Sequence, residues 1–201
     1  MLTLHTWTTP NGKKPAIMLA ELELRCDLRL VDIGKGAQKS PEYLRINPNG
    51  KIPALVDDDV TIFESGAILL HLADKTKRLI PQSPDGRAEV LSWLFWQVGG
   101  PGPTFGQLHK FQAEQPRDEK VYGHFLEEAK RLTTVLDNRL ANREYICRDY
   151  SIADIASYPW FVAAKEGMPD VLMDTKNVTG WLARMSERPA VKRGMALELP
   201  R

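Results

Sequence analysis

The chain has 201 residues, of which 43% are hydrophobic and 26% are charged. This composition is typical of a folded globular protein and argues against disorder, and the length allows one domain or two small ones. The formal net charge of +1 gives no general electrostatic reason to expect nucleic acid or a membrane surface as a partner. No apolar run approaches the roughly 18 residues that a membrane span requires.

Two features of the sequence indicate the cytoplasm. The first residues, Met1–His5, have neither a charged start nor an apolar segment, so we expect no secretory signal. The two cysteines, Cys26 and Cys147, lie far apart and form neither a CxxC pair nor a metal-type spacing. We therefore expect a reducing environment and no bound metal.

The first eighty residues alternate strand and helix signals. In chain order the patterns predict a strand over residues 2–5, a loop over 8–12, a helix with Pro15 in its first turn, a strand over 28–31, a short helix over 41–46, a hairpin with strands 54–56 and 60–63, and a helix over 65–73. This order favours a small mixed sheet covered by helices.

Strand signals disappear after residues 81–86, which have the composition of a linker. Beyond it we expect a helix over 88–98 that stops at Gly99–Pro103, an amphipathic helix over 121–140, a helix opened by a capping box of Ser151 and Asp154, and a helix over 178–185 stopped by Pro189. The prediction is an α/β domain over residues 1–80, a linker over 81–86 and an all-helical domain over 87–201.

Two motifs point to a small zwitterion with a peptide backbone. In Asn49–Val56, Ile52 would offer its backbone N–H and C=O to an extended peptide, and a cis bond before Pro53 would turn that edge outward. In Phe63–Ile68, Ser65 at a helix start would present its hydroxyl and backbone N–H groups to a carboxylate, while Glu64 would hold an ammonium. Carboxylate, amine and peptide backbone together describe glutathione. The alternative for the second motif is an ordinary helix cap.

The chain resembles the cytosolic glutathione transferases and is most similar to their bacterial nu class. The blocks that carry this resemblance are Thr9–Lys13, Asp32–Gly36 with Gln38, Asn49–Val56, Phe63–Leu72, Trp93–Gly100 and Tyr150–Ala156. The resemblance implies a thioredoxin-like N-terminal domain followed by a C-terminal helical bundle. It also implies an enzyme that uses glutathione as a substrate or co-substrate, and a homodimer.

The same resemblance assigns the thiolate donors to the first loop. In the nu-class pattern Thr9 and Asn11 stabilise the glutathione thiolate, backed by the start of the following helix. No Tyr or Cys stands in this loop, where other transferase classes place one, and this absence agrees with the nu class. The alternative for Thr9–Gly12 is an ordinary turn, since Pro and Asn-Gly are turn residues.

Other residues are assigned to ligand binding with a competing interpretation beside each. Gln38 matches a loop position that touches the glutathione backbone, or is a surface residue. Lys51 pairs with the glycyl carboxylate, or is solvated. Arg131 reaches glutathione in nu-class relatives, although an exposed helical Arg is the commoner case. Gln107 and His109 follow the Gly-Pro-Gly-Pro break and are candidates for the second-substrate pocket.

The absence of a thiol in the first loop bears on the chemistry. The protein would not form a mixed disulfide with its substrate, so disulfide reduction would take both electrons from two glutathione molecules. We expect a glutathione-dependent disulfide-bond reductase. The alternatives are a transferase that conjugates glutathione to small electrophiles and a non-catalytic glutathione-binding regulator or scaffold.

Overall fold

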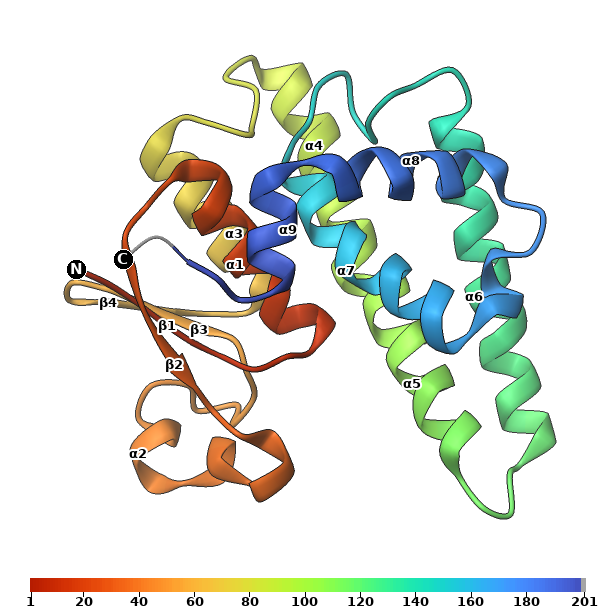
Figure 1. Ribbon diagram of the computed structural model, residues 1–201, viewed down its shortest axis with the longest axis horizontal. Coiled ribbons are helices and arrows are strands. Elements are labelled where there is room, and N and C mark those ends of the chain that lie inside the picture. The colour runs from red at the N-terminus through yellow and green to blue at the C-terminus, as the bar shows by residue number, and fades with distance from the viewer. Residues whose placement is uncertain (200–201) are drawn as a thin grey trace. The chain divides into compact units, whose positions relative to one another are not determined.

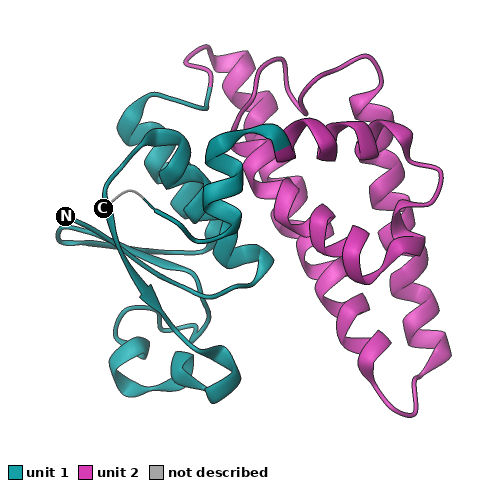
Figure 2. Ribbon diagram, viewed as in Figure 1, with its two compact units in different colours: residues 1–80, 187–201 teal, residues 81–186 magenta. Residues whose placement is uncertain are grey.

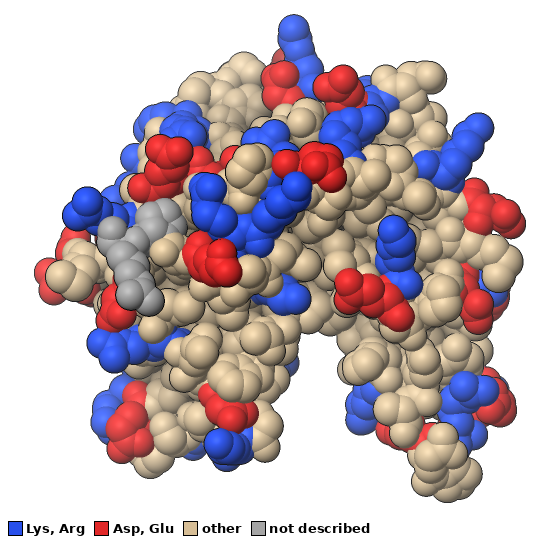
Figure 3. Space-filling model, in the orientation of Figure 1, with Lys and Arg blue, Asp and Glu red and all other residues tan. Residues whose placement is uncertain are grey.

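The computed structural model describes residues 1–199 and divides the chain into two units (Figure 2). Unit 1 contains residues 1–80 together with the described residues from 187 onward, and unit 2 contains residues 81–186. Within residues 1–199, no helix is both long enough and apolar enough to cross a membrane. Lys and Arg side chains alternate with Asp and Glu over the face drawn in Figure 3, as the small net charge suggests.

Unit 1 is built on a mixed four-stranded sheet in the order β2-β1-β3-β4. The strands are β1 (Leu2–Thr6), β2 (Cys26–Leu30), β3 (Ala54–Asp57) and β4 (Val60–Phe63). The central strand β1 pairs parallel with β2 and antiparallel with β3, which pairs antiparallel with β4. Alternate residues of β1 are buried, so the strand has one face toward the helices that cover the sheet.

Helices lie on both faces of this sheet. Unit 1 contains α1 (Pro10–Leu22), α2 (Pro41–Leu44), α3 (Ser65–Thr76) and α9 (Pro189–Met195), and the 3₁₀ turns η1 (Ile33–Lys35) and η2 (Ala37–Lys39). In Figure 1, α1 and α3 lie over one face, with α9 packed against α1, and α2 lies beyond the other face. The core of the unit comes from the fully buried side chains of α1 and α3, among them Ile17, Leu19 and Leu69.

The last helix packs on the first. Gly194 of α9 approaches α1 so closely that a Cβ atom there would lie 2.3 Å from the Cα of Ile17. Arg188 forms a two-pronged ion pair with Glu21 of α1, at 2.9 and 3.1 Å. The described residues from 187 onward therefore group with the sheet, whereas the sequence-based division places them in the helical domain. A seven-residue helix has too short a hydrophobic pattern to reveal which partner it covers.

Unit 2 is entirely helical. Its elements are α4 (Pro84–Gly99), α5 (Pro101–Ala113), α6 (Glu119–Leu140), α7 (Ile152–Gly167), η3 (Pro169–Leu172) and α8 (Lys176–Glu187), the last of which ends at the boundary with unit 1. The buried face of α6 includes Leu132, Leu136 and Leu140, at the spacing expected of an amphipathic helix. Trp181 of α8 packs edge-on against Tyr158 and Phe161 of α7.

The predicted capping box at the start of α7 is present and forms the polar centre of unit 2. Asp154 is fully buried, and its carboxylate accepts hydrogen bonds from the N–H groups of Ser151 and Ile146 and from the indole Nε1–H of Trp181, at 3.0–3.1 Å. Burial raises the pKa of Asp154 to about 6, although these donors act in the opposite direction. One carboxylate thus ties together α7, the segment before it and α8.

Three local expectations are changed by the structure. Thr9 caps α1 and Pro10 takes its first position, so the expected loop over 8–12 contributes a helical turn and Pro15 lies inside the helix. Helix α4 begins at Pro84, which shortens the expected linker to residues 81–83. Helix α4 stops at Gly99 as expected, but Pro101 opens α5 after a single residue. In each case a Pro stands at the first helical position, where its missing N–H costs nothing.

Candidate functional site

The first loop and the start of α1 form a rigid turn. The Oγ1 of Thr9 accepts a hydrogen bond from the N–H of Gly12 at 3.2 Å, which satisfies one first-turn donor. The Oγ1–H of Thr6 donates to the carbonyl of Gly12 at 2.9 Å. A Cβ at Gly12 would lie 2.1 Å from the carbonyl oxygen of Trp7, so only glycine fits where the loop returns to the helix.

This turn fixes the direction of the Thr9 hydroxyl. Because Oγ1 accepts the bond from Gly12, its own hydrogen remains available to donate to another group. Thr9 is half-buried, and Asn11, two residues later in the first turn of α1, is also half-buried. A hydroxyl donor and the start of a helix are the groups that a thiolate requires. Their assignment to catalysis stays a prediction.

A second segment, Lys51–Pro53, is fixed by hydrogen bonds from two side chains. The carbonyl of Lys51 accepts hydrogen bonds from the Tyr43 hydroxyl at 2.7 Å and from the Asn47 side-chain amide at 2.6 Å. The peptide bond between Ile52 and Pro53 is cis. The side chain of Lys51 is exposed and Ile52 is half-buried. Sequence reasoning did not identify the two supporting residues, although they lie only eight and four residues before Lys51.

Gln38, on η2, lies beside the same segment. The backbone carbonyl oxygen of Gln38 would be 3.2 Å from a Cβ atom on Gly50, so η2 lies close to the residue that precedes Lys51–Pro53. The side-chain oxygen of Gln38 is buried and, among the described residues, accepts no hydrogen bond. A buried polar atom without a partner is uncommon, and a donor on a bound peptide would satisfy it. This observation agrees with the assignment of Gln38 to the ligand.

The start of α3 is the third element. Glu64 has φ 71° and ψ 121°, a backbone conformation that costs a non-glycine residue about 1–3 kcal/mol and is concentrated at functional sites. Its side chain forms no capping hydrogen bond with the helix. Ser65, the first helical residue, is 6% exposed, whereas Glu64 is exposed. The first turn of α3 is thus presented without a side-chain cap of its own, as an anion site requires.

The structure adds Lys14, which sequence reasoning missed. This residue on α1 is 1% exposed, and its Nζ lies 3.4 Å from the Oγ of Ser65. Burial lowers the pKa of Lys14 to about 7, while the carboxylate of Glu64 acts to raise it. The contact joins the helix of the first loop to the start of α3. No local signal reveals it, because Lys13-Lys14 in a helix reads as a solvated pair.

The remaining three predicted residues belong to unit 2, where they lie on α5 and α6, two helices that pack against each other. Arg131, on α6, is exposed and forms a two-pronged ion pair with Glu128, with both N–O distances at 2.7 Å. Gln107 and His109 are exposed on α5. Their assignment to glutathione and to a second substrate stays a prediction. An exposed Arg131 paired with Glu128 on the same helix also fits the alternative, an ordinary surface arginine.

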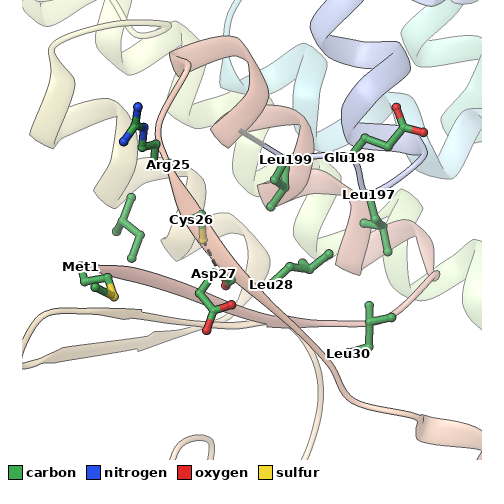
Figure 4. A pocket seen from close by; sticks show the side chains of 10 residues that line it. Met1, Arg25, Cys26, Asp27, Leu28, Leu30, Leu197, Glu198 and Leu199 are labelled. Atoms are coloured by element: carbon green, nitrogen blue, oxygen red, sulfur yellow. Dashed lines mark hydrogen bonds between the residues drawn. The ribbon is translucent and has the colours of Figure 1, made fainter. Parts of the chain in front are cut away.

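Neither cysteine has the surroundings of a reactive thiol. Burial raises the pKa of Cys26 to about 11 and that of Cys147 to about 12. Cys26 lines a cavity of about 840 Å³ between β2 and residues 197–199, where its Sγ is 3.5 Å from the carbonyl oxygen of Asp27 (Figure 4). Both thiols stay protonated near neutrality, and none of the predicted glutathione residues lines this cavity. Within residues 1–199, no three His, Cys, Asp or Glu side chains are placed to hold a metal ion.

Comparison with known families gives the identity of this arrangement. A model of the glutathione S-transferase N-terminal domain matches residues 1–74, and a model of the C-terminal domain of the same proteins matches residues 102–189. The chain belongs to the glutathione S-transferase family. The disulfide-bond oxidoreductase YfcG of Escherichia coli is 44% identical to it over 206 residues, which cover 98% of this chain and 94% of that protein.

Two solved structures of this family show what such proteins hold. A glutathione transferase from Burkholderia graminis, with two glutathione molecules bound per subunit, has 43% identity and a TM-score of 0.89 over 96% of this chain and 87% of that one. A glutathione transferase from Pseudomonas putida, with one glutathione disulfide bound per subunit, has 37% identity and a TM-score of 0.90. The match covers 96% of this chain and 90% of that one. The predicted glutathione transferase fold is thereby confirmed.

Proposed function

We propose that this member of the glutathione S-transferase family is a glutathione-dependent disulfide-bond oxidoreductase of the nu class, active as a cytoplasmic homodimer. The observation that carries the proposal is the 44% identity to YfcG, named a disulfide-bond oxidoreductase, over almost the whole length of both chains. The inert surroundings of both cysteines support the same chemistry, because they leave glutathione as the source of electrons.

The reaction balances with two glutathione molecules. The thiolate of the first attacks one sulfur of the substrate disulfide, whose S–S bond breaks, and the leaving sulfur takes a proton. The thiolate of the second then attacks the glutathione sulfur of the mixed disulfide and releases the remaining substrate sulfur, which also takes a proton. The products are two substrate thiols and one glutathione disulfide. The solved relatives with two glutathiones or one glutathione disulfide per subunit hold molecules of the kinds this scheme requires.

The chain's own residues have distinct tasks in this proposal. The hydroxyl of Thr9, oriented by its bond to Gly12, donates to the thiolate of the first glutathione, with Asn11 beside it. The side-chain oxygen of Gln38 and the backbone of Ile52, before the cis bond to Pro53, bind the peptide part.

The ends of glutathione are bound by other groups. Ser65 and the first turn of α3 hold the γ-glutamyl carboxylate, and Glu64 holds the amine of the same group. Lys51 pairs with the glycyl carboxylate. In unit 2, Arg131 would have to leave Glu128 to reach glutathione, and Gln107 and His109 line the second-substrate pocket.

Reduction of hydroxyethyl disulfide by glutathione, coupled to glutathione reductase and followed by loss of NADPH, tests the proposal. Turnover well above the uncatalysed rate is the expected result, and scattering-coupled gel filtration of the same sample should give the mass of a dimer. No turnover in protein that still binds glutathione would overturn the reductase proposal.

A second candidate is conjugation of glutathione to an electrophile, which the family-model matches favour. It uses the same bound thiolate but a single glutathione per turnover. A panel of small electrophiles, with glutathione consumption followed against product mass, separates the two. The third possibility, a regulator or scaffold, would bind glutathione and turn over neither kind of substrate.

A further inference from the structure

Lys14 is a buried cation next to the group that, in the proposed function, binds the carboxylate of glutathione. Its Nζ lies 3.4 Å from the Oγ of Ser65, and the side chain is 1% exposed. A lysine in the core is uncommon, because removal of an ammonium from water is costly unless another group compensates it. Met or Leu at this position would avoid that cost, so the contact of this lysine with Ser65 merits a functional explanation.

We propose that Lys14 is a positioning residue for glutathione: its ammonium donates to the Oγ of Ser65, so that the hydroxyl hydrogen points to the ligand's γ-glutamyl carboxylate, and the same nitrogen takes up a proton when that carboxylate binds. This inference rests on the proposed function. It assigns no new site, but adds a residue and a proton to the binding step.

The direction of the Ser65 hydroxyl depends on the charge of Lys14. An ammonium has three donors and no acceptor, so Ser65 accepts from it and its own hydrogen is directed elsewhere. A neutral amine has a lone pair, and would compete with the ligand for that hydrogen. The charged form of Lys14 therefore favours binding of an anion at the start of α3, where the helix dipole acts in the same sense.

The electrostatic surroundings make this nitrogen sensitive to a bound anion. Burial lowers the pKa of Lys14 to about 7, so near neutrality both the charged and the neutral form are populated. The carboxylate of Glu64, on α3, opposes this effect, and the carboxylate of a ligand at Ser65 would add to that opposition. The ligand's ammonium, which the proposed function places at the exposed Glu64, acts in the opposite direction, but the carboxylate lies at the buried Ser65 in contact with Lys14. We expect the effect of the nearer carboxylate to prevail, so that the pKa of Lys14 rises on binding and the ligand is held more tightly below neutral pH than above it.

Other charged groups around α1 act elsewhere. The titratable residue of β1 is His5, whose pKa is lowered by burial and then by the charge of Arg29 on β2. From α9, Arg188 and Arg193 bind groups in the last turn of α1, about two turns from Lys14. The carboxylate of Glu64 is thus a charged group that acts on Lys14 directly.

Titration calorimetry with S-methylglutathione tests the inference, because its thioether has no thiol proton to release. The titration is run near neutrality in two buffers of different ionisation enthalpy, and the difference in heat gives the number of protons taken up. We expect a net uptake of protons, below one per site, by the natural chain. Lys14→Met should take up none and bind about 10- to 100-fold more weakly, as for loss of a charge-assisted hydrogen bond. Lys77→Met, at an exposed lysine, is the matched control.

The Ser65→Ala variant and the double variant complete the test. If Lys14 acts through Ser65, the double variant should bind about as weakly as the weaker single variant, because the two changes remove one interaction. Fold-changes that multiply would overturn action through Ser65, and absence of proton uptake in the natural chain would overturn the linked protonation. No binding of S-methylglutathione by the natural chain, which urea unfolding shows to be folded, would instead refute the proposed function.

Discussion

Replacement of Thr9 by Val separates two tasks that the structure gives to one hydroxyl. Thr9→Val keeps the shape of the side chain but removes the acceptor for the Gly12 N–H, bonded at 3.2 Å, and the donor proposed for the thiolate. Loss of the cap should lower the free energy of unfolding by about 1 kcal/mol, which for a chain of this size lowers Tm by about 2–4 °C. Thr9→Ser restores both groups and is the control.

The second task is measured in the ligand rather than in the protein. A charge-assisted hydrogen bond of about 1.5–3 kcal/mol corresponds to about one to two pKa units of the bound thiol. Ultraviolet absorbance of the thiolate, followed against pH at saturating glutathione, should therefore show the pKa of the bound thiol rising by that amount in Thr9→Val. A lower Tm with an unmoved thiol titration would refute the catalytic assignment and leave Thr9 as a helix cap.

Four further predictions concern Asn11, Asp154 and the two cysteines. Asn11→Ala should also raise the pKa of bound glutathione, and an unmoved titration would remove Asn11 from the mechanism. Asp154→Ala leaves three buried donors without an acceptor and should lower the free energy of unfolding in urea by about 3–5 kcal/mol; a loss under 1 kcal/mol would contradict this. The pKa of Asp154 is 3.8 in the unfolded chain and about 6 in the folded protein, so between these two pH values the folded state binds more protons than the unfolded one. The free energy of unfolding should therefore fall as pH rises through this window. Asp154→Asn should abolish this trend. Cys26→Ser with Cys147→Ser should retain hydroxyethyl disulfide turnover, and an inactive, folded double variant would require a protein thiol.

The predictable part of the fold is the part encoded by local patterns. The hairpin over 54–63, the capping box of Ser151 and Asp154 and the apolar face of α6 each use residues close in sequence, so spacing alone revealed them. Helix starts were less accurate, because Pro10, Pro84 and Pro101 were interpreted as loop residues although each occupies a first helical turn.

The site divides in the same way. The segments at Thr9, Ile52 and Ser65 were proposed from the sequence because each has a recognisable local motif, and their roles stay predictions. Lys14 was not, since its role depends on a partner 51 residues away that only the packing of α1 and α3 brings near. The unpaired oxygen of Gln38 is likewise a property of the folded chain.

The return of α9 to α1 has a consequence for synthesis of the chain. During translation the sheet of unit 1 emerges first, but the helix that covers Ile17 leaves the ribosome only after about a hundred residues of unit 2. Until then, apolar surface of α1 has no cover from its own polypeptide, and such surface invites aggregation or chaperone binding. Residues 1–80 expressed alone would keep that exposed face permanently, whereas the same segment mixed with a peptide of residues 187–199 could regain its cover.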